Sequence, residues 1–591
     1  PDTPKATRVS QRSNKGTHKP TWSPTLNSGQ KYSIEQQMAK GAFWSESMLS
    51  SDIPKSKEKR HETLIKPTYP KEWDIKIPKT MKQALKSEYR EEWSLAINIE
   101  NKNLQNHDTF TYENYSNQKK LGTKYVFDVK HDEDGNIVKF KARLVAKGYE
   151  QIYLQHYDQT YAPVAYLSSI LIILVIAVTF GLNILTLDFK GAFLHSLMPK
   201  EYPVHIDTPR GMYCPPGKVI RLNKSLYGTK NAGHLWWKDM KNLLTSERFN
   251  QNAHDQCVFY KFENGHFTII ATWVDDLMIC SNDPGISSLR KQFEAKGFKI
   301  STFEDLDWFL GISIKTNKDG TITLDQSAYI DHLLNKFNMT DCHPCDTPIT
   351  TAALNQENVS PGIDPKKVPY RSLIGGLSHL ARFTRPDILY ATFYFARFQN
   401  KPTQAHWKLL KRVLRYLKKT KDQKITIKKP VGKPILTVRA FTDADWATAN
   451  NNDDYKSTSG WVIQINENNV GCVSRKQKLK TAQSSCESEL YAAGQCTMDI
   501  IWVRNFIEEI YQTSLPPTTL YCDNKAVIDN VNGDRNCRRL KHCMVKLNLL
   551  RDHNGKEIQL KKISSKENIA DIFTKILSRG PFEYLRNKLF D

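Results

Sequence analysis

The chain has 591 residues, of which 39% are hydrophobic and 25% charged, and it carries a net charge of +23 at pH 7. This length is enough for roughly three to five domains with cores of their own, and the composition excludes a disordered protein. So large a positive surplus favours a polyanionic partner, nucleic acid or an anionic membrane surface, over a basic surface that serves only solubility.

Little else supports a membrane protein. The longest apolar run, Leu167 to Val178, is too short to span a bilayer and predicts a buried core helix. No secretory signal opens the chain, and its start at Pro1 suggests a processed product or a fragment of a polyprotein. Eleven cysteines without framework spacing fit a reducing compartment. Cys342 and Cys345 have zinc-like spacing, but no second pair follows nearby, so a zinc site is not favoured.

The N-terminal half begins with a polar segment and continues with helix and strand patterns. Residues 1–70, rich in Ser, Thr, Pro, Lys and Asn, predict a mobile tail or linker. Residues 80–104 predict a helix, and residues 124–130 and 137–149 predict two strands joined at an Asp-Gly hairpin turn. A buried helix and a strand at residues 184–193 follow.

Two adjacent carboxylates, Asp275 and Asp276, separate two apolar strand patterns within residues 267–283. Taken alone, they favour a polar hairpin turn. The strand at residues 184–193, however, carries Asp188 among apolar residues, and a buried Asp is costly unless it is paired or bound to a cation. Carboxylates from neighbouring strands that hold two Mg²⁺ ions are a common device for phosphoryl transfer. Basic side chains that bind a triphosphate should then lie nearby, and the preceding strand pattern offers Lys141, Arg143 and Lys147.

A basic amphipathic helix is predicted at residues 403–421. Trp407, Leu410, Leu414 and Leu417 share one face of it. The remaining surface is basic, with Lys408, Lys411, Arg412, Arg415, Lys418 and Lys419. This surface is either a solvated face or a helix that tracks a phosphate backbone.

After the two prolines of residues 429–434, the order of strand, hairpin, helix, strand and helix predicts a separate α/β domain of about 150 residues. Four acids lie in separate elements of it: Asp443, Glu489, Asp523 and Asp571. Each alone would be a solvated acid or a helix cap. Asp445 and Glu487 are alternatives to Asp443 and Glu489, because each lies two residues away.

Six motifs in this order carry a family resemblance: KFKARLVAKGYEQ, LDFKGAFL, LNKSLYGTKNAGHLWW, WVDDLMI, FLGI and YRSLIGGLSHLARFTRPDI. Together they resemble the reverse transcriptase of copia-type (pseudovirus) LTR retrotransposons, from about Trp93 to the C-terminus. The resemblance implies a multidomain α+β and α/β chain, with a right-hand polymerase of fingers, palm and thumb before a ribonuclease H-like mixed-sheet domain. The expected parts are fingers and palm at 71–325, thumb and connection at 326–432, and ribonuclease H at 433–591. Residues 1–70 would be a junction with an upstream integrase.

The resemblance also implies roles for individual residues. Asp188, Asp275 and Asp276 match the catalytic metal-binding triad of the palm. The substrate-binding positions are Arg143 with Lys130 for the triphosphate, Phe193 as steric gate, Gly228, Lys230 and Asn231 under the nucleotide, and Leu310 and Gly311 as primer grip. The family usually has Leu-Lys-Gln where this chain has Thr229, Lys230 and Asn231. Its Arg before the first Asp motif is missing here.

The C-terminal acids resemble the catalytic Asp-Glu-Asp-Asp site of ribonuclease H, with Asp443, Glu489, Asp523 and Asp571 as metal ligands. The implied cofactor is Mg²⁺, two ions per site, with Mn²⁺ as an alternative. The implied partners are an RNA template, an RNA–DNA hybrid, a primer such as a tRNA, dNTPs, and the integrase and capsid of the same element, without a membrane. The implied setting is cytoplasmic virus-like particles with nuclear entry of the replication complex. A catalytically reduced nucleic-acid-binding descendant of such an element is the rival prediction.

Overall fold

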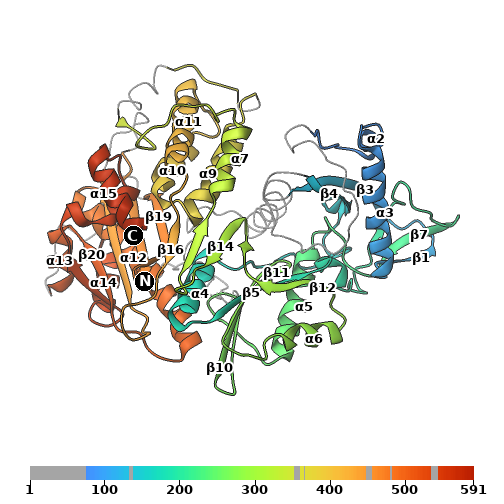
Figure 1. Ribbon diagram of the computed structural model, residues 1–591, viewed down its shortest axis with the longest axis horizontal. Helices are drawn as coiled ribbons and strands as arrows, with labels where there is room; N and C mark the ends of the chain where they lie inside the picture. The colour runs from blue at the N-terminus through green and yellow to red at the C-terminus, as the bar shows by residue number, and fades with distance from the viewer. Residues whose placement is uncertain are drawn as a thin grey trace, which may run out of the picture.

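The computed structural model describes residues 75–131, 137–351, 360–364, 367–446, 455–478, 482–533 and 543–590. The predicted tail at 1–70 and the predicted turn at 132–136 lie outside these ranges. Figure 1 shows the chain running from α2 and α3 at one side, through a central sheet, to the C-terminal elements at the opposite side. Sheets with helices packed on their faces make up each part, as the fold class predicted.

The first part packs two helices on two small sheets. Its elements are α2 (Met81–Ala84), α3 (Arg90–Asn106), β1 (Phe110–Asn114), β2 (Lys120–Leu121), β3 (Thr123–His131), β4 (Ile137–Ala146), β6 (His205–Ile206) and β7 (Lys218–Leu222). Strands β3 and β4 form the predicted antiparallel pair, and the other four form a sheet in the order β1-β7-β6-β2. Trp93 of α3 is fully buried and packs edge-on against Phe127 and Phe140, with ring centroids 5.2 and 4.7 Å away.

The helix predicted at residues 80–104 is interrupted, because the chain forms two helices there with a non-helical segment at residues 85–89. In this segment the Ser87 hydroxyl donates to the Ala84 carbonyl at 2.6 Å. Helix α3 starts at Arg90, and its own register turns Trp93 into the core.

The central sheet has six strands in the order β12-β5-β11-β10-β9-β8. They are β5 (Asn183–Phe189), β8 (Asn250–Gln251), β9 (Val258–Glu263), β10 (His266–Trp273), β11 (Asp276–Ser281) and β12 (Ile300–Asp305). Its helices are α4 (Leu167–Phe180), α5 (Ala232–Ser246) and α6 (Ser288–Ala295). Alternate residues of β11 face opposite ways: Met278 and Cys280 lie in one core with α4, whereas Leu277 and Ile279 lie in another with α5 and α6.

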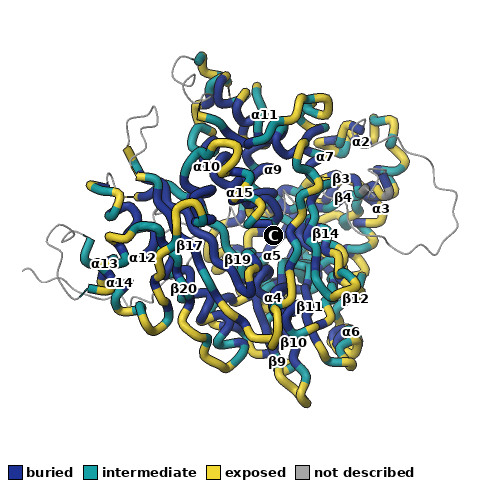
Figure 2. The backbone as a smooth tube through the Cα atoms, turned by 60° about the vertical axis from the view of Figure 1, so that its left-hand side comes forward, coloured by how far each residue is buried: buried dark blue, intermediate teal, exposed yellow. Residues whose placement is uncertain are grey.

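Helix α4 confirms the predicted buried helix. Its residues Ile172, Ile173, Val175 and Ile176 have no exposed surface. The reason is that α4 has neighbours on two sides: it packs against β10 and β11 of the central sheet and against β19 (Asn468–Lys476) of the C-terminal sheet. In Figure 2 it lies within the darkest, most buried region. An apolar run with no polar face is therefore an interior helix.

The third part joins a small sheet to a helical layer. The sheet has the order β13-β14-β15-β16, with β13 (Trp308–Phe309), β14 (Ile312–Thr316), β15 (Ile322–Asp325) and β16 (Ile425–Ile427). The helical segments are α7 (Ser327–Lys336), α9 (Tyr370–Phe383), η5 (Pro386–Ile388), α10 (Leu389–Ala396) and α11 (Gln404–Lys419). Strand β16 pairs with β15 across about a hundred residues of chain, so the helices form one long insertion between two paired strands.

The basic face of α11 is largely occupied by the chain itself. Lys418 Nζ donates to the carbonyls of Thr340 and Cys342, at 2.6 and 2.9 Å. Arg415 Nε donates to the His343 carbonyl at 2.6 Å. These basic side chains are therefore not simply solvated, and those bonded to carbonyls are not free to contact phosphates. Both predicted alternatives are corrected in this respect. Cys345 of the zinc-like pair directs its thiol at the Arg412 carbonyl.

The C-terminal part is a five-stranded mixed sheet in the order β19-β18-β17-β20-β21. Its remaining strands are β17 (Val438–Asp445), β18 (Thr458–Ile465), β20 (Thr518–Cys522) and β21 (Ile558–Lys562). Strands β17, β18 and β19 run antiparallel, whereas β20 and β21 continue the sheet in parallel with β17. The helical segments are α12 (Ser485–Tyr511), α13 (Lys525–Asn532), α14 (Met544–His553), η7 (Ser565–Glu567), η8 (Ile569–Phe573) and α15 (Arg579–Phe590).

The C-terminal sheet and the central sheet are joined by direct packing in one hydrophobic core. The Trp502 ring of α12 lies 5.6 Å from that of Tyr166, and its Nε1 donates to the His254 carbonyl at 3.2 Å. The Glu509 carboxylate accepts the Ala253 amide. Among the helices in the described ranges, none combines the length and apolarity needed to cross a bilayer.

Candidate active sites

Asp188, Asp275 and Asp276 are neighbours at the ends of adjacent strands of the six-stranded sheet. Asp276, the first residue of β11, lies directly opposite Asp188 of β5 in the antiparallel register. Asp275 occupies the two-residue turn between β10 and β11, after Val274 with φ +54°. The predicted hairpin turn is therefore present beside Asp188, and the role of the three carboxylates as metal ligands remains a prediction.

Neighbouring side chains and backbone hold this turn in place. Trp236 Nε1 of α5 donates to the Val274 carbonyl at 2.5 Å, and the Phe189 amide donates to the Asp275 carbonyl at 3.2 Å. A left-handed backbone at a β-branched residue is strained, so the Trp236 bond offsets a local cost. The Ser301 hydroxyl of β12 donates to Asp188 Oδ2 at 2.6 Å. One Asp188 oxygen therefore already has a partner beside the other carboxylates.

Tyr227 links the acidic turn to the predicted nucleotide-binding residues. The Arg143 guanidinium lies 5.7 Å from the centre of its ring, and the Phe193 ring packs edge-on at 5.8 Å. Burial, and then the Glu100 carboxylate, raise the pKa of Tyr227; Asp275 and Asp188 act in the same direction, and Arg143 opposes them. Arg143, Phe193 and the acidic turn therefore surround one neutral phenol.

The loop from Gly228 to Asn231 packs tightly on the end of β4. The Ala146 amide donates to the Tyr227 carbonyl at 2.8 Å. Gly228 has φ +84°, and a Cβ built there would lie 2.4 Å from the Ala146 carbonyl oxygen. Lys230 Nζ donates to the Gln151 carbonyl at 3.1 Å and lies 5.0 Å from the Tyr157 ring centre. Asn231 is buried, and its Oδ1 has no hydrogen-bond partner.

The remaining predicted substrate residues lie on other elements. Leu310 and Gly311 form the two-residue turn between β13 and β14, both with positive φ, and His379 approaches the Leu310 carbonyl at 3.2 Å. Lys130 lies near the end of β3, opposite Lys139 of β4. The structure therefore gathers Arg143 and Phe193 around Tyr227, and it places the predicted primer grip in a separate sheet.

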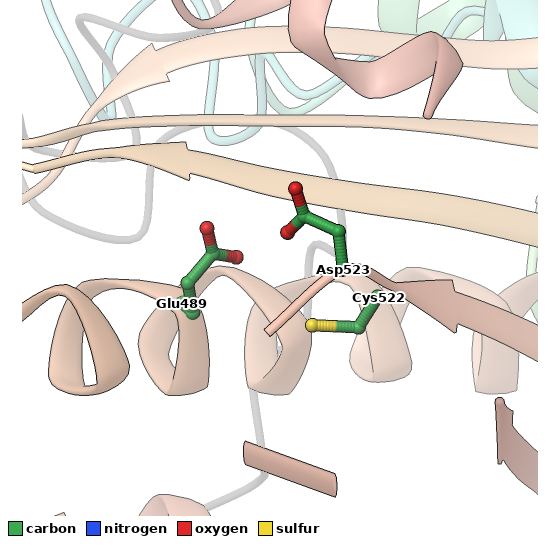
Figure 3. A group of neighbouring side chains, drawn as sticks. All are labelled: Glu489, Cys522 and Asp523. Carbon is green, nitrogen blue, oxygen red and sulfur yellow. The ribbon is translucent and has the colours of Figure 1, made fainter. Parts of the chain in front are cut away.

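A second acidic cluster forms at the C-terminal sheet, where four elements converge. Asp443 belongs to β17, Glu489 to α12, Asp523 follows β20, and Asp571 belongs to η8. Oxygen atoms of Asp443, Asp523 and Asp571 lie within 4.8 Å of one another, as do ligand atoms of Glu489, Cys522 and Asp523. In Figure 3 the carboxylates of Glu489 and Asp523 point toward one another. The four predicted acids therefore form one cluster.

This cluster is buried and strongly acidic. Glu489 and Asp571 are 5% and 7% exposed, and each has one carboxylate oxygen without a hydrogen-bond partner. Burial, followed by the Asp443 carboxylate, raises the pKa of Glu489 well above its ordinary value. The same two causes raise the pKa of Asp571 to about 7. Buried carboxylates with unpaired oxygens suit a hard divalent cation, because Mg²⁺ prefers oxygen ligands. The donor set therefore fits the predicted metal.

Local geometry separates the predicted alternatives. Glu487 bonds at the start of α12: its amide donates to Ser484 Oγ at 3.2 Å, and its carboxylate accepts the Gln483 amide at 2.6 Å. Glu489 instead lies within the acidic cluster. Asp443 also belongs to that cluster, and Asp445 does not. The catalytic assignment of these acids remains a prediction.

Five side chains beside the two clusters were not predicted as site residues. Asp443 Oδ2 accepts the Thr574 hydroxyl, and the Ser565 hydroxyl donates to Asp523 Oδ2 at 2.7 Å. Lys575 forms an ion pair with Asp571 of the same cluster. Beside the acidic turn, Ser301 donates a hydrogen bond to Asp188, and the Tyr227 ring lies under the Arg143 guanidinium. Thr574 and Lys575 follow Asp571 in the sequence, so the segment IADIFTK was a signal that could have identified them.

The sheets with their packed helices and these acidic side chains define a class: a multidomain α/β chain of the reverse transcriptase type. Residues 107–351 match the family model described as "Reverse transcriptase (RNA-dependent DNA polymerase)". The chain is 31% identical over 523 residues to the retrovirus-related Pol polyprotein from transposon TNT 1-94 of Nicotiana tabacum, covering 86% of this chain and 38% of that protein.

A second relative is the Pol polyprotein from transposon RE1 of Arabidopsis thaliana, 32% identical over 518 residues, with 87% of this chain and 34% of that protein covered. A foamy viral protease-reverse transcriptase structure aligns with a TM-score of 0.44 at 11% identity, over 90% of this chain and 80% of that one. The chain belongs to the reverse transcriptase region of copia-type retrotransposon Pol polyproteins. It spans little more than a third of the two Pol polyproteins.

Proposed function

We propose that this chain copies RNA and DNA templates into DNA and degrades the RNA strand of RNA–DNA hybrids, as part of retrotransposon replication. The observation that carries the proposal is the presence of two separate sets of acids on two different sheets of one chain: Asp188, Asp275 and Asp276 at neighbouring strand ends, and the buried cluster of the C-terminal sheet. The net charge of +23 supports nucleic acid as the partner. The division into fingers and palm, thumb and connection, and ribonuclease H at residues 71–325, 326–432 and 433–591 belongs to the same proposal.

In the polymerase reaction, Asp188, Asp275 and Asp276 are the residues that would hold two Mg²⁺ ions. Such ions would supply activation of the primer hydroxyl and stabilisation of the leaving phosphate. Arg143 contributes a fixed positive charge for the triphosphate, next to the Tyr227 ring that it covers. Phe193 packs against the same ring, which limits its movement and suits a steric gate against a ribose 2′-hydroxyl. Lys130 assists with the triphosphate, the loop from Gly228 to Asn231 lies under the nucleotide, and Leu310 and Gly311 support the primer.

In hybrid cleavage, Asp443, Glu489, Asp523 and Asp571 are the residues that would hold Mg²⁺, and the ion would supply the activation of water for attack on the RNA phosphodiester. Thr574 and Ser565 orient two of these carboxylates by donating hydrogen bonds to Asp443 and Asp523. Fixed ligands lower the reorganisation needed when the cation binds. The sheet therefore supplies Asp443 and Asp523, and the packed helical segments supply the other two.

The test is an assay of the purified full chain on two substrates with Mg²⁺. One substrate is a DNA primer annealed to an RNA template with dNTPs, and the other is a labelled RNA–DNA hybrid. We expect extension of the primer and endonucleolytic cleavage of the RNA strand, both abolished by EDTA. Tight binding of the hybrid without either reaction would contradict the proposal and would favour the non-catalytic descendant.

A further inference from the structure

Lys575 places a positive charge inside the C-terminal acidic cluster. Its Nζ lies 2.9 Å from Asp571 Oδ2 and 3.5 Å from Asp443 Oδ2. Asp571 and Asp443 belong to different elements, η8 and β17, and their side chains are 10% and 3% exposed. The ammonium therefore bridges two buried carboxylates that would otherwise repel one another.

Lys575 lies where the C-terminal part meets the helical layer. Together with Pro348, Asp387 and Tyr390, Lys575 lines a cavity of about 10 Å³, large enough for roughly one water molecule. Asp387 and Tyr390 belong to η5 and α10, outside the C-terminal sheet. The Lys575 side chain is nevertheless 36% exposed, so its ammonium has room to move away from the carboxylates when another cation takes its place.

The same carboxylates that Lys575 contacts belong to a donor set for a metal ion. Asp443, Asp523 and Asp571 bring oxygens within 4.8 Å of one another, and the Oδ1 atom of Asp571 has no hydrogen-bond partner. A divalent cation among these oxygens would lie close to the ammonium, and like charges repel strongly at such distances in a buried site. The ammonium and a cation cannot both occupy their preferred positions.

We propose that Lys575 is a tethered counter-ion of this site, which holds Asp443 and Asp571 together without metal and is displaced when a divalent cation binds. Lys575 thereby sets the Mg²⁺ concentration at which the site fills. The regulatory consequence rests on the proposed ribonuclease H function, whereas the competition itself concerns only metal binding.

The test uses the full chain with Asp275→Asn and Asp276→Asn, so that the palm site does not dominate metal binding. Melting temperature is measured against Mg²⁺ concentration for this parent and for Lys575→Met, which keeps an apolar stem. We expect a lower melting temperature in EDTA, because the carboxylate repulsion is no longer neutralised. We also expect half-saturation at a Mg²⁺ concentration lower by on the order of tenfold, since the competing charge is gone. Lys566→Met, at an exposed lysine of η7, is the matched control and should change neither value.

An unchanged half-saturation concentration in Lys575→Met, or a higher one, would overturn the proposal. If that variant does not fold, amine acylation of the unaltered chain gives the second measurement. Mass spectrometry should show Lys575 protected in EDTA and reactive with saturating Mg²⁺, while Lys566 reacts equally in both. Equal protection of Lys575 under both conditions, in protein that binds Mg²⁺, would likewise overturn it. Absence of hybrid cleavage with the expected Lys575 behaviour would defeat the proposed function alone.

Discussion

At the scale of single residues, Gly228 occupies a position where the chain has no room for a side chain. Its φ is +84°, and a Cβ would lie 2.4 Å from both the Ala146 carbonyl oxygen and Val145 Cγ1. We expect Gly228→Ala to lower the free energy of unfolding by about 1–2 kcal/mol for the left-handed backbone and by about 1–3 kcal/mol more for the overlap. Urea unfolding measures the total.

Gly217 provides the matched control for this prediction. Its φ is +73°, but nothing lies within 4 Å of a Cβ built there. Gly217→Ala should therefore carry only the backbone cost. Equal losses in the two variants would show that the packing of the loop on β4 does not constrain Gly228.

Asp499 makes the stability of the C-terminal domain depend on pH without any metal. It is 3% exposed, and its Oδ2 accepts a hydrogen bond from Trp461 Nε1 at 3.0 Å. Burial raises its pKa from 3.8 to about 7. Because the folded state holds this proton more tightly, the contribution is full below pH 3.8 and is lost as pH rises through about 7.

We therefore expect the parent in EDTA to lose up to about 4 kcal/mol more of its stability across this range than Asp499→Asn, which keeps only the pH dependence of other raised carboxyls such as Asp571 and Glu489. Asn keeps an oxygen that can accept the Trp461 bond. Denaturation curves at several pH values measure the difference. Parallel pH profiles for parent and variant would show that Asp499 is already ionised at low pH.

Some residue assignments could be predicted from sequence, and others depended on distant contacts. Ser484 and Glu487 have the Ser-x-x-Glu spacing of a helix cap, so local chemistry already indicated that Glu489, rather than Glu487, was available for the cluster. Ser301, by contrast, reaches Asp188 from a strand more than a hundred residues away. No local pattern indicates such a contact, because it depends on which strands pair.

At the scale of elements, α11 shows that a basic face can be structural. Lys418 donates hydrogen bonds to the carbonyls of Thr340 and Cys342, in the segment that follows α7. We expect Lys418→Met to cost about 1–3 kcal/mol, because both carbonyls lose a charged donor. Lys408 lies exposed on the same helix, and Lys408→Met should change stability by less than about 0.5 kcal/mol. Thermal unfolding compares the two, and a Lys408 effect as large as that of Lys418 would contradict this account of the helix.

Apolar patterns predicted several elements well. Helix α11 has a one-sided pattern, and strands β10 and β11 are apolar runs that are buried almost throughout; the structure confirms all three. The helix predicted at residues 80–104 is interrupted between Ala84 and Arg90, within a sequence whose apolar periodicity continues. Periodicity reports which face is buried, and it does not report a local interruption of this kind.

At the scale of the whole molecule, the two candidate sites are carried by parts that share one hydrophobic core. Trp502 of α12 is 4% exposed and lies against Tyr166 and Phe506, with ring centroids 5.6 and 5.5 Å away. We expect Trp502→Ala to cost about 3–5 kcal/mol. Because Trp502 joins both parts, limited proteolysis should then cleave the central and C-terminal sheets at similarly increased rates. Increased cleavage confined to the C-terminal part would show that the two parts unfold independently.

This joint core could not be predicted from the sequence. The bond from Trp502 Nε1 to His254 spans about 250 residues, and nothing near either residue marks the other. The lack of a polar face on α4 did indicate neighbours on more than one side. This pattern could not identify β19 as the second neighbour, because a sequence pattern shows which residues are buried but not which element buries them.

The central claim is that one chain carries two independent metal-dependent sites. The most direct measurement compares Asp275→Asn/Asp276→Asn with Asp443→Asn in primer extension and hybrid cleavage, on the same preparations of folded full chain. We expect the first variant to lose extension by at least on the order of a hundredfold and to keep cleavage, and the second to show the reverse. Loss of both activities in either variant, or of neither, would contradict two independent sites.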